Sequence, residues 1–67
     1  MKLHTTVRLR KDLLEHGLRS GAVGAIVAVF DNPSQAYEVE FTDEQGRTIA
    51  ELALREEQLE EVLGRLS

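Results

Sequence analysis

Short runs in which hydrophobic and polar residues alternate predict several β-strands. The clearest lie at Thr5–Arg10, Ala36–Thr42 and Arg47–Leu54. Successive side chains of a strand point to opposite faces, so each run is expected to bury one face and expose the other. Glu38 and Glu40 then point outward. The residues expected to point inward are Val7, Leu9, Tyr37, Val39, Phe41, Ala50, Leu52 and Leu54.

A fourth run, Ala22–Phe30, has no polar face. Such a run is typical of a central strand that is covered at least partly on both sides. Gly24 lies inside it, and a glycine within a strand most often marks a bulge or a sharp bend. Ile49 is out of phase with its own strand, so it either covers the other face or marks a bulge.

The segments between these runs are rich in turn-forming residues. Lys11–Gly21 is expected to form a long loop, which its three leucines pin to the core. Asp31–Ser34 is expected to turn the chain, because Asx residues bond the local backbone and proline fixes φ. Asp43–Gly46 is a short hairpin loop with Gly46 in the left-handed conformation.

The C-terminal segment follows a different period. Leu59, Val62, Leu63 and Leu66 are spaced as one stripe of a helix. Acidic residues begin this segment and Arg65 lies near its end, which suits a helix dipole. We therefore expect a short helix from about Glu56 to Leu66.

Length and charge limit what the domain can be. Sixty-seven residues make a single domain, 1–67, and a chain of this size buries only about 60% of its unfolded surface. The net charge is −4, with basic residues concentrated before residue 31 and acidic residues after it. This uneven charge favours an oriented protein partner, although ordinary solvated surface explains it equally well.

The run Gly21–Val27 followed by Tyr37–Phe41 resembles the G-x-x-G-x-I-V and Y-x-V-x-F pattern of a family of small bacterial proteins of unknown function. The resemblance extends over about residues 2–59. It implies a mainly β fold: a small SH3-like or KOW-like barrel of four to five antiparallel strands. Such a barrel usually closes with a 3₁₀ turn and a fifth strand. The C-terminal residues of this chain instead favour a helix, so either a short helix or a 3₁₀ segment is expected there. The resemblance implies an accessory, antitoxin-like or immunity-like role.

No motif for catalysis or for a cofactor is present. His4 and His16 are the only histidines, the chain has no cysteine, and no three-ligand metal spacing occurs. Ser20 lacks the frame of a nucleophile elbow, and no glycine pattern matches a phosphate-binding loop. The outward acids Glu38 and Glu40 have no evident cleft that would shift their pKa values. We expect neither an enzyme nor a cofactor, metal or small-molecule substrate.

The remaining functions are binding functions, and a protein-interaction module is the leading hypothesis. The candidate partner-binding residues are Arg8, Arg10, Lys11, Glu15, His16 and Arg19, with the acidic C-terminal segment as a second surface. KOW-like RNA binding is the alternative. The acidic net charge opposes it, and so does the expectation that Phe30, Tyr37 and Phe41 all lie in the core.

Self-association through the stripe of Leu59, Val62, Leu63 and Leu66 is a third possibility. No apolar run is long enough to cross a bilayer, and the first residues lack the apolar region of a signal peptide. We therefore expect a soluble, cytoplasmic protein with no membrane partner.

Overall fold

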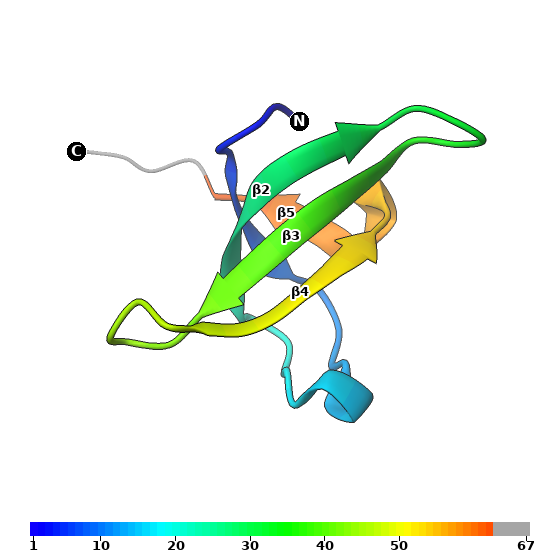
Figure 1. Cartoon of the computed structure of the whole chain (residues 1–67). Coiled ribbons are helices and arrows are strands. Elements are labelled where there is room, and N and C mark those ends of the chain that lie inside the picture. The colour runs from blue at the N-terminus through cyan, green and yellow to red at the C-terminus, as the bar shows by residue number, and fades with distance from the viewer. Residues whose placement is uncertain (63–67) are drawn as a thin grey trace.

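Five antiparallel strands and two 3₁₀ turns make up the computed structural model, which describes residues 1–62 (Figure 1). The sheet has the order β4-β3-β2-β1-β5. The prediction of a mainly β domain with four to five antiparallel strands is confirmed. The elements are β1 (Thr6–Leu9), η1 (Leu14–His16), β2 (Val23–Phe30), β3 (Ala36–Thr42), β4 (Thr48–Leu54), η2 (Glu56–Gln58) and β5 (Leu59–Glu61).

The core lies on the inner face of this single curled sheet. β3 has neighbours on both sides, and its alternation is as predicted: Tyr37, Val39 and Phe41 are buried, while Glu38 and Glu40 lie on the outer face. The other buried side chains are Val7, Leu9, Leu18, Ile26, Leu54 and Leu59. Period-two alternation therefore identified most of the core.

Gly24 marks a close approach of two strands, and the bulge lies elsewhere. The register between β2 and β3 shifts between Ile26 and Ala28, so the predicted bulge at Gly24 is displaced along the strand. A Cβ atom at position 24 would lie 2.8 Å from the carbonyl oxygen of Glu40 and 2.9 Å from a ring carbon of Phe41. Only glycine lets the backbone of β2 pass this close to β3.

β2 is the middle strand of the sheet, as predicted, but its outer face is covered only in part. Val23, Val27 and Val29 are exposed, and Phe30 is 43% exposed. A single curled sheet encloses one core, and no second layer covers its outer face among the described residues. Phe30 is therefore not one of the core aromatics.

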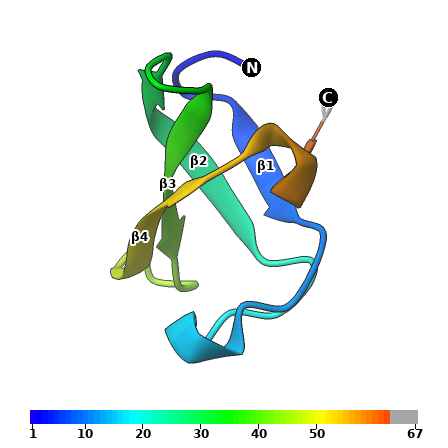
Figure 2. The same cartoon turned by 90° about the vertical axis from the view of Figure 1, so that its right-hand side faces the viewer.

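The loop between β1 and β2 contributes one leucine to the core. Leu18 is buried and Leu13 packs against the core, but Leu14 points outward and is 63% exposed. Leu13 and Leu18 exchange two main-chain hydrogen bonds, and η1 lies between them. Figure 2 shows this loop extending beyond the end of the sheet. The prediction that all three leucines pin the loop is therefore only partly correct.

The predicted C-terminal helix is wrong within the described residues. After η2 the chain becomes extended, and β5 pairs with β1, with Leu59 opposite Leu9 and Glu60 opposite Arg8. The pairing continues to Val62, whose N–H donates to the carbonyl oxygen of Thr6. Hydrogen bonds to β1 and the burial of Leu59 favour the strand over a helix. Leu63 and Leu66 lie outside the described residues.

The hairpin between β3 and β4 follows the prediction. Gly46 has a φ of 82°, and the carboxylate of Asp43 accepts hydrogen bonds from the main-chain N–H groups of Gln45 and Arg47. These hydrogen bonds hold the pKa of Asp43 below its ordinary value. The register shifts just beyond the loop, and Ile49 there is 60% exposed, which agrees with a bulge.

Three carboxylates cluster on the outer face of β3 and β4. Glu40 lies opposite Glu51 and receives a hydrogen bond from the hydroxyl of Thr48. Burial raises the pKa of Glu38, and the hydrogen bond and charge of Glu51 raise it further. The outer face therefore carries unfavourable like charge. No helix among residues 1–62 has the length and apolar character needed to cross a membrane.

Replacing Gly24 by alanine is expected to destabilise the fold by about 1–3 kcal/mol, because the added methyl group meets backbone that cannot move aside. The same change inside an ordinary strand stabilises by roughly 0.5–1 kcal/mol. Urea unfolding at constant m-value measures the difference. Ala25→Gly is the control, with an expected cost of about 0.5–1 kcal/mol. A gain in stability for Gly24→Ala would contradict the close approach.

Glu51→Gln is expected to raise the free energy of unfolding at pH 7 by a few tenths of a kcal/mol, up to about 1 kcal/mol. The pKa of Glu38 is higher in the folded protein than in the unfolded chain, where it is near 4.5. Protonation of Glu38 therefore stabilises the fold fully below pH 4.5, and this contribution is lost as the pH rises through the pKa of the folded state. The gain should therefore shrink when urea unfolding is repeated below pH 4.5. Glu44→Gln, in the exposed hairpin loop, controls for net charge. An equal gain at both pH values would contradict the coupling.

Candidate functional site

Arg8 lies on the outer face of β1, between Val23 of β2 and Glu60 of β5. One of its guanidinium nitrogens is 4.0 Å from a carboxylate oxygen of Glu60, and both side chains are about half exposed. An exposed ion pair at this distance contributes little to stability. Arg8 is therefore accessible, but its charge is partly matched within the chain.

Arg10 joins the end of β1 to η2 and β5. Its Nε donates a 2.9 Å hydrogen bond to the carbonyl oxygen of Leu59, and its main-chain N–H donates to the carbonyl oxygen of Gln58. Its own carbonyl oxygen accepts from the hydroxyl of Ser20. This predicted binding residue thus also has a structural role, because it holds the last strand to the first.

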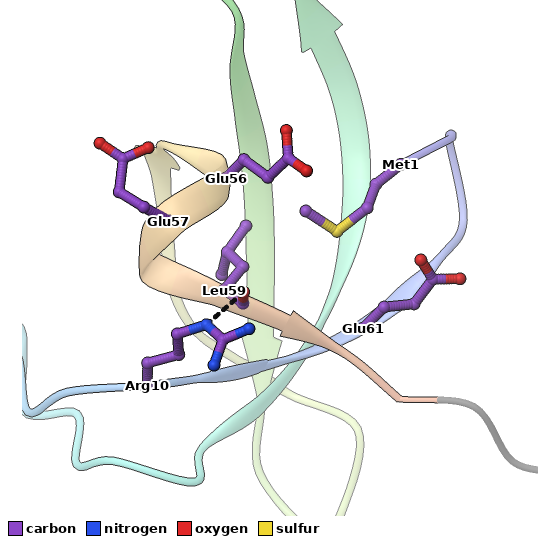
Figure 3. A pocket seen from close by; sticks show the side chains of 6 residues that line it. All are labelled: Met1, Arg10, Glu56, Glu57, Leu59 and Glu61. Carbon is purple, nitrogen blue, oxygen red and sulfur yellow. Dashed lines mark hydrogen bonds between the residues drawn. The ribbon is translucent and has the colours of Figure 1, made fainter.

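A hollow of about 540 Å³ lies beside this junction (Figure 3). Met1 and Leu59 provide its apolar surface, and three carboxylates surround it: Glu56 and Glu57 from η2 and Glu61 from β5. Arg10 is the only basic side chain in its lining. Three carboxylates against Arg10 and the amino group of Met1 leave the first hollow with a net negative charge, which favours a cationic group.

A second hollow of about 310 Å³ adjoins the first, and Glu57 lines both. Leu9 and Leu13 form its apolar part, and Lys11 lies at its edge. Asp12, Glu57 and Gln58 complete the lining. We call the two together the double hollow. Its position between the β1–β2 loop and η2 brings the basic end of β1 against the acidic C-terminal segment.

Glu15, His16 and Arg19 do not line the double hollow. Glu15 and His16 form η1, which ends at Gly17 with a φ of 71°. The loop is held by its own hydrogen bonds, among them one of 2.7 Å from the N–H of Ser20 to the carboxylate of Asp12. The six predicted binding residues are therefore spread over three places: the outer face, the double hollow and the tip of the loop.

Tyr37 is the one buried residue with a polar group close to these hollows. Burial raises the pKa of its hydroxyl group, and the nearby carboxylates of Glu56 and Asp31 raise it further. The main-chain amino group of Met1 donates a hydrogen bond of 3.4 Å to this hydroxyl. Tyr37 therefore stays protonated near neutral pH and serves as a structural hydrogen-bond partner.

The sequence predicts the acidic C-terminal segment as a second surface, separate from the basic residues, and does not predict that η2 lies beside Arg10. The sequence places Glu56 and Glu57 in the first turn of a longer helix, whereas in the structure they belong to the short turn η2, which is followed by β5. The main-chain N–H of Gln58 donates to the carbonyl oxygen of Arg55, which closes the 3₁₀ turn, and the main-chain N–H of Arg55 donates to Oε1 of Gln58, which caps it. Within residues 1–62 no group of three acidic, histidine or cysteine side chains is arranged to hold a metal ion.

Comparison with known proteins places the chain in a family and gives no function. No curated protein and no solved structure matches it. A family model described as a domain of unknown function, DUF4926, matches residues 3–61, which include all five strands and both 3₁₀ turns. The chain therefore belongs to the DUF4926 family.

Proposed function

We propose that this protein is a small SH3-like interaction module, not an enzyme, and that it binds a partner protein through the double hollow. The 3₁₀ turn η2 followed by the fifth strand β5 supports the SH3-like comparison, because that is how such barrels usually close. The observation that carries the binding proposal is the double hollow itself, in which apolar and acidic side chains lie side by side and Glu57 is shared by both hollows.

The lining of the double hollow indicates the kind of partner. Grooves that bind proline-rich segments are lined by aromatic side chains, and neither hollow has one. The first hollow instead combines three carboxylates with apolar surface. An extended partner segment with a lysine or arginine beside an apolar residue fits this combination best, with the cation near Glu57.

RNA binding is less well supported. The exposure of Phe30 removes the objection that all the aromatic side chains lie in the core, but the charge around Phe30 still opposes RNA binding. Phe30 lies opposite Ala36 on the outer face, where the neighbouring pair is Ala28 and Glu38. Phosphate groups would approach carboxylates at this place, so electrostatic attraction is absent where the aromatic ring is available. An accessory role, as in an antitoxin-like or immunity-like complex, agrees better with a protein-binding surface.

Glu57→Lys is expected to weaken partner binding at least tenfold, roughly 1.4 kcal/mol, because it reverses the charge that both hollows share. The partner is first captured from the native host with the unmodified chain, and its affinity is then measured by calorimetry. Glu57 is exposed, and its contact with Arg55 is long, so the fold should be retained.

Glu44→Lys makes the same charge change in the distant hairpin loop and is the matched control. Equal affinity of the two variants for the partner would contradict binding at the double hollow. Binding of an unstructured RNA at low salt, lost as salt is added, would instead favour the nucleic-acid alternative.

A further inference from the structure

The two edge strands of the sheet, β4 and β5, differ in how well they are protected against pairing with another chain. β5 has three residues, two of them glutamates. β4 has seven residues, and Glu51 is its only ionisable side chain. Natural edge strands are usually kept short or charged so that they do not pair with other chains. β5 is both short and charged, whereas β4 is long and carries a single charge.

The free side of β4 has no partner within the described residues. β4 pairs only with β3, and Figures 1 and 2 show no other element along its outer side. Among residues 1–62, no main-chain hydrogen bond outside the sheet involves a residue of Thr48–Leu54. An edge strand directs about half of its N–H and C=O groups away from the sheet, and those of β4 are therefore available to another strand.

The side chains of β4 limit how two copies could pair. In a symmetric antiparallel pair, the two copies are related by a twofold axis and their outer faces lie on the same side of the joint sheet. When this axis passes through a residue position, that residue lies opposite the same residue of the second copy. A pair centred on Glu51 places two carboxylates opposite each other, which is unfavourable. A pair centred on Ala53 places Glu51 opposite Arg55 of the second copy, and does so twice.

The register centred on Ala53 is also suitable on the inner face. There Leu52 lies opposite Leu54 of the second copy, and both are apolar. Arg55 follows β4 directly with an extended backbone (φ −91°, ψ 161°), and its side chain is 67% exposed. Its charge can therefore reach a carboxylate on an added strand.

We propose that β4 pairs antiparallel with β4 of a second copy of this chain, centred on Ala53, to form a dimer with one continuous sheet. In this register only residues 51–55 of the two copies lie opposite each other, a narrow contact that is much smaller than the roughly 1,600 Å² of a standard interface. The dimer is therefore weak and forms at high concentration. Neither Thr48–Leu54 nor Arg55 lines the double hollow, but Arg55 contacts Glu57, so Glu51→Arg alone separates self-association from partner binding.

Sedimentation velocity between roughly 10 µM and roughly 1 mM tests the dimer, since weak interfaces dissociate in this range. Glu51→Arg should raise the dissociation constant at least about tenfold, because two attractive pairs become repulsive. This variant keeps its fold, since it removes like charge next to Glu38. The double variant Glu51→Arg/Arg55→Glu restores the opposite charges and should recover the dimer.

Glu44→Arg is the matched control and should leave the dissociation constant unchanged. Hydrogen exchange gives a second measurement, in which amides within residues 51–54 become protected as concentration rises. A strict monomer at 1 mM, or a dimer that Glu51→Arg does not weaken, would overturn the proposal. Protection of β4 that appears only when another protein is added would also overturn it, and would assign the edge to that protein's strand.

Discussion

The inner face of one curled sheet has to supply the whole core of this domain. β3 lies at the centre of that requirement, because Tyr37, Val39 and Phe41 are buried in a row along it. The sheet closes around this row only if β2 passes very near β3, and Gly24 permits that approach by having no side chain. The β1–β2 loop and β5 then add Leu18 and Leu59 at the margins of the core.

The same requirement explains the outer surface. The described residues form no second layer over the sheet, so several apolar residues of β2 remain exposed. The acids of β3 and β4 keep that face charged, although Glu38 and Glu51 repel each other there. The like charge on this face therefore costs some stability.

The sequence predicted the strands well and their surroundings poorly, for a physical reason. Alternation with a period of two is a local property, so the inward residues of β3 could be identified without knowing their neighbours. The role of Gly24 depends on the backbone of Glu40, sixteen residues away. Likewise, the exposure of Phe30 depends on which layers the fold lacks. Neither can be read from the residues nearby.

The C-terminal segment shows the same limit and connects it to function. Leu59 and Val62 fit one face of a helix, yet pairing with β1 and the hydrogen bond from Arg10 to Leu59 favour a strand. That closure places η2 against the end of β1 and thereby forms the double hollow. Arg10 and Lys11 could be predicted as binding residues from their charge. Glu56 and Glu57 could be predicted only as part of a separate acidic surface, because their place beside Arg10 depends on where the last strand lies.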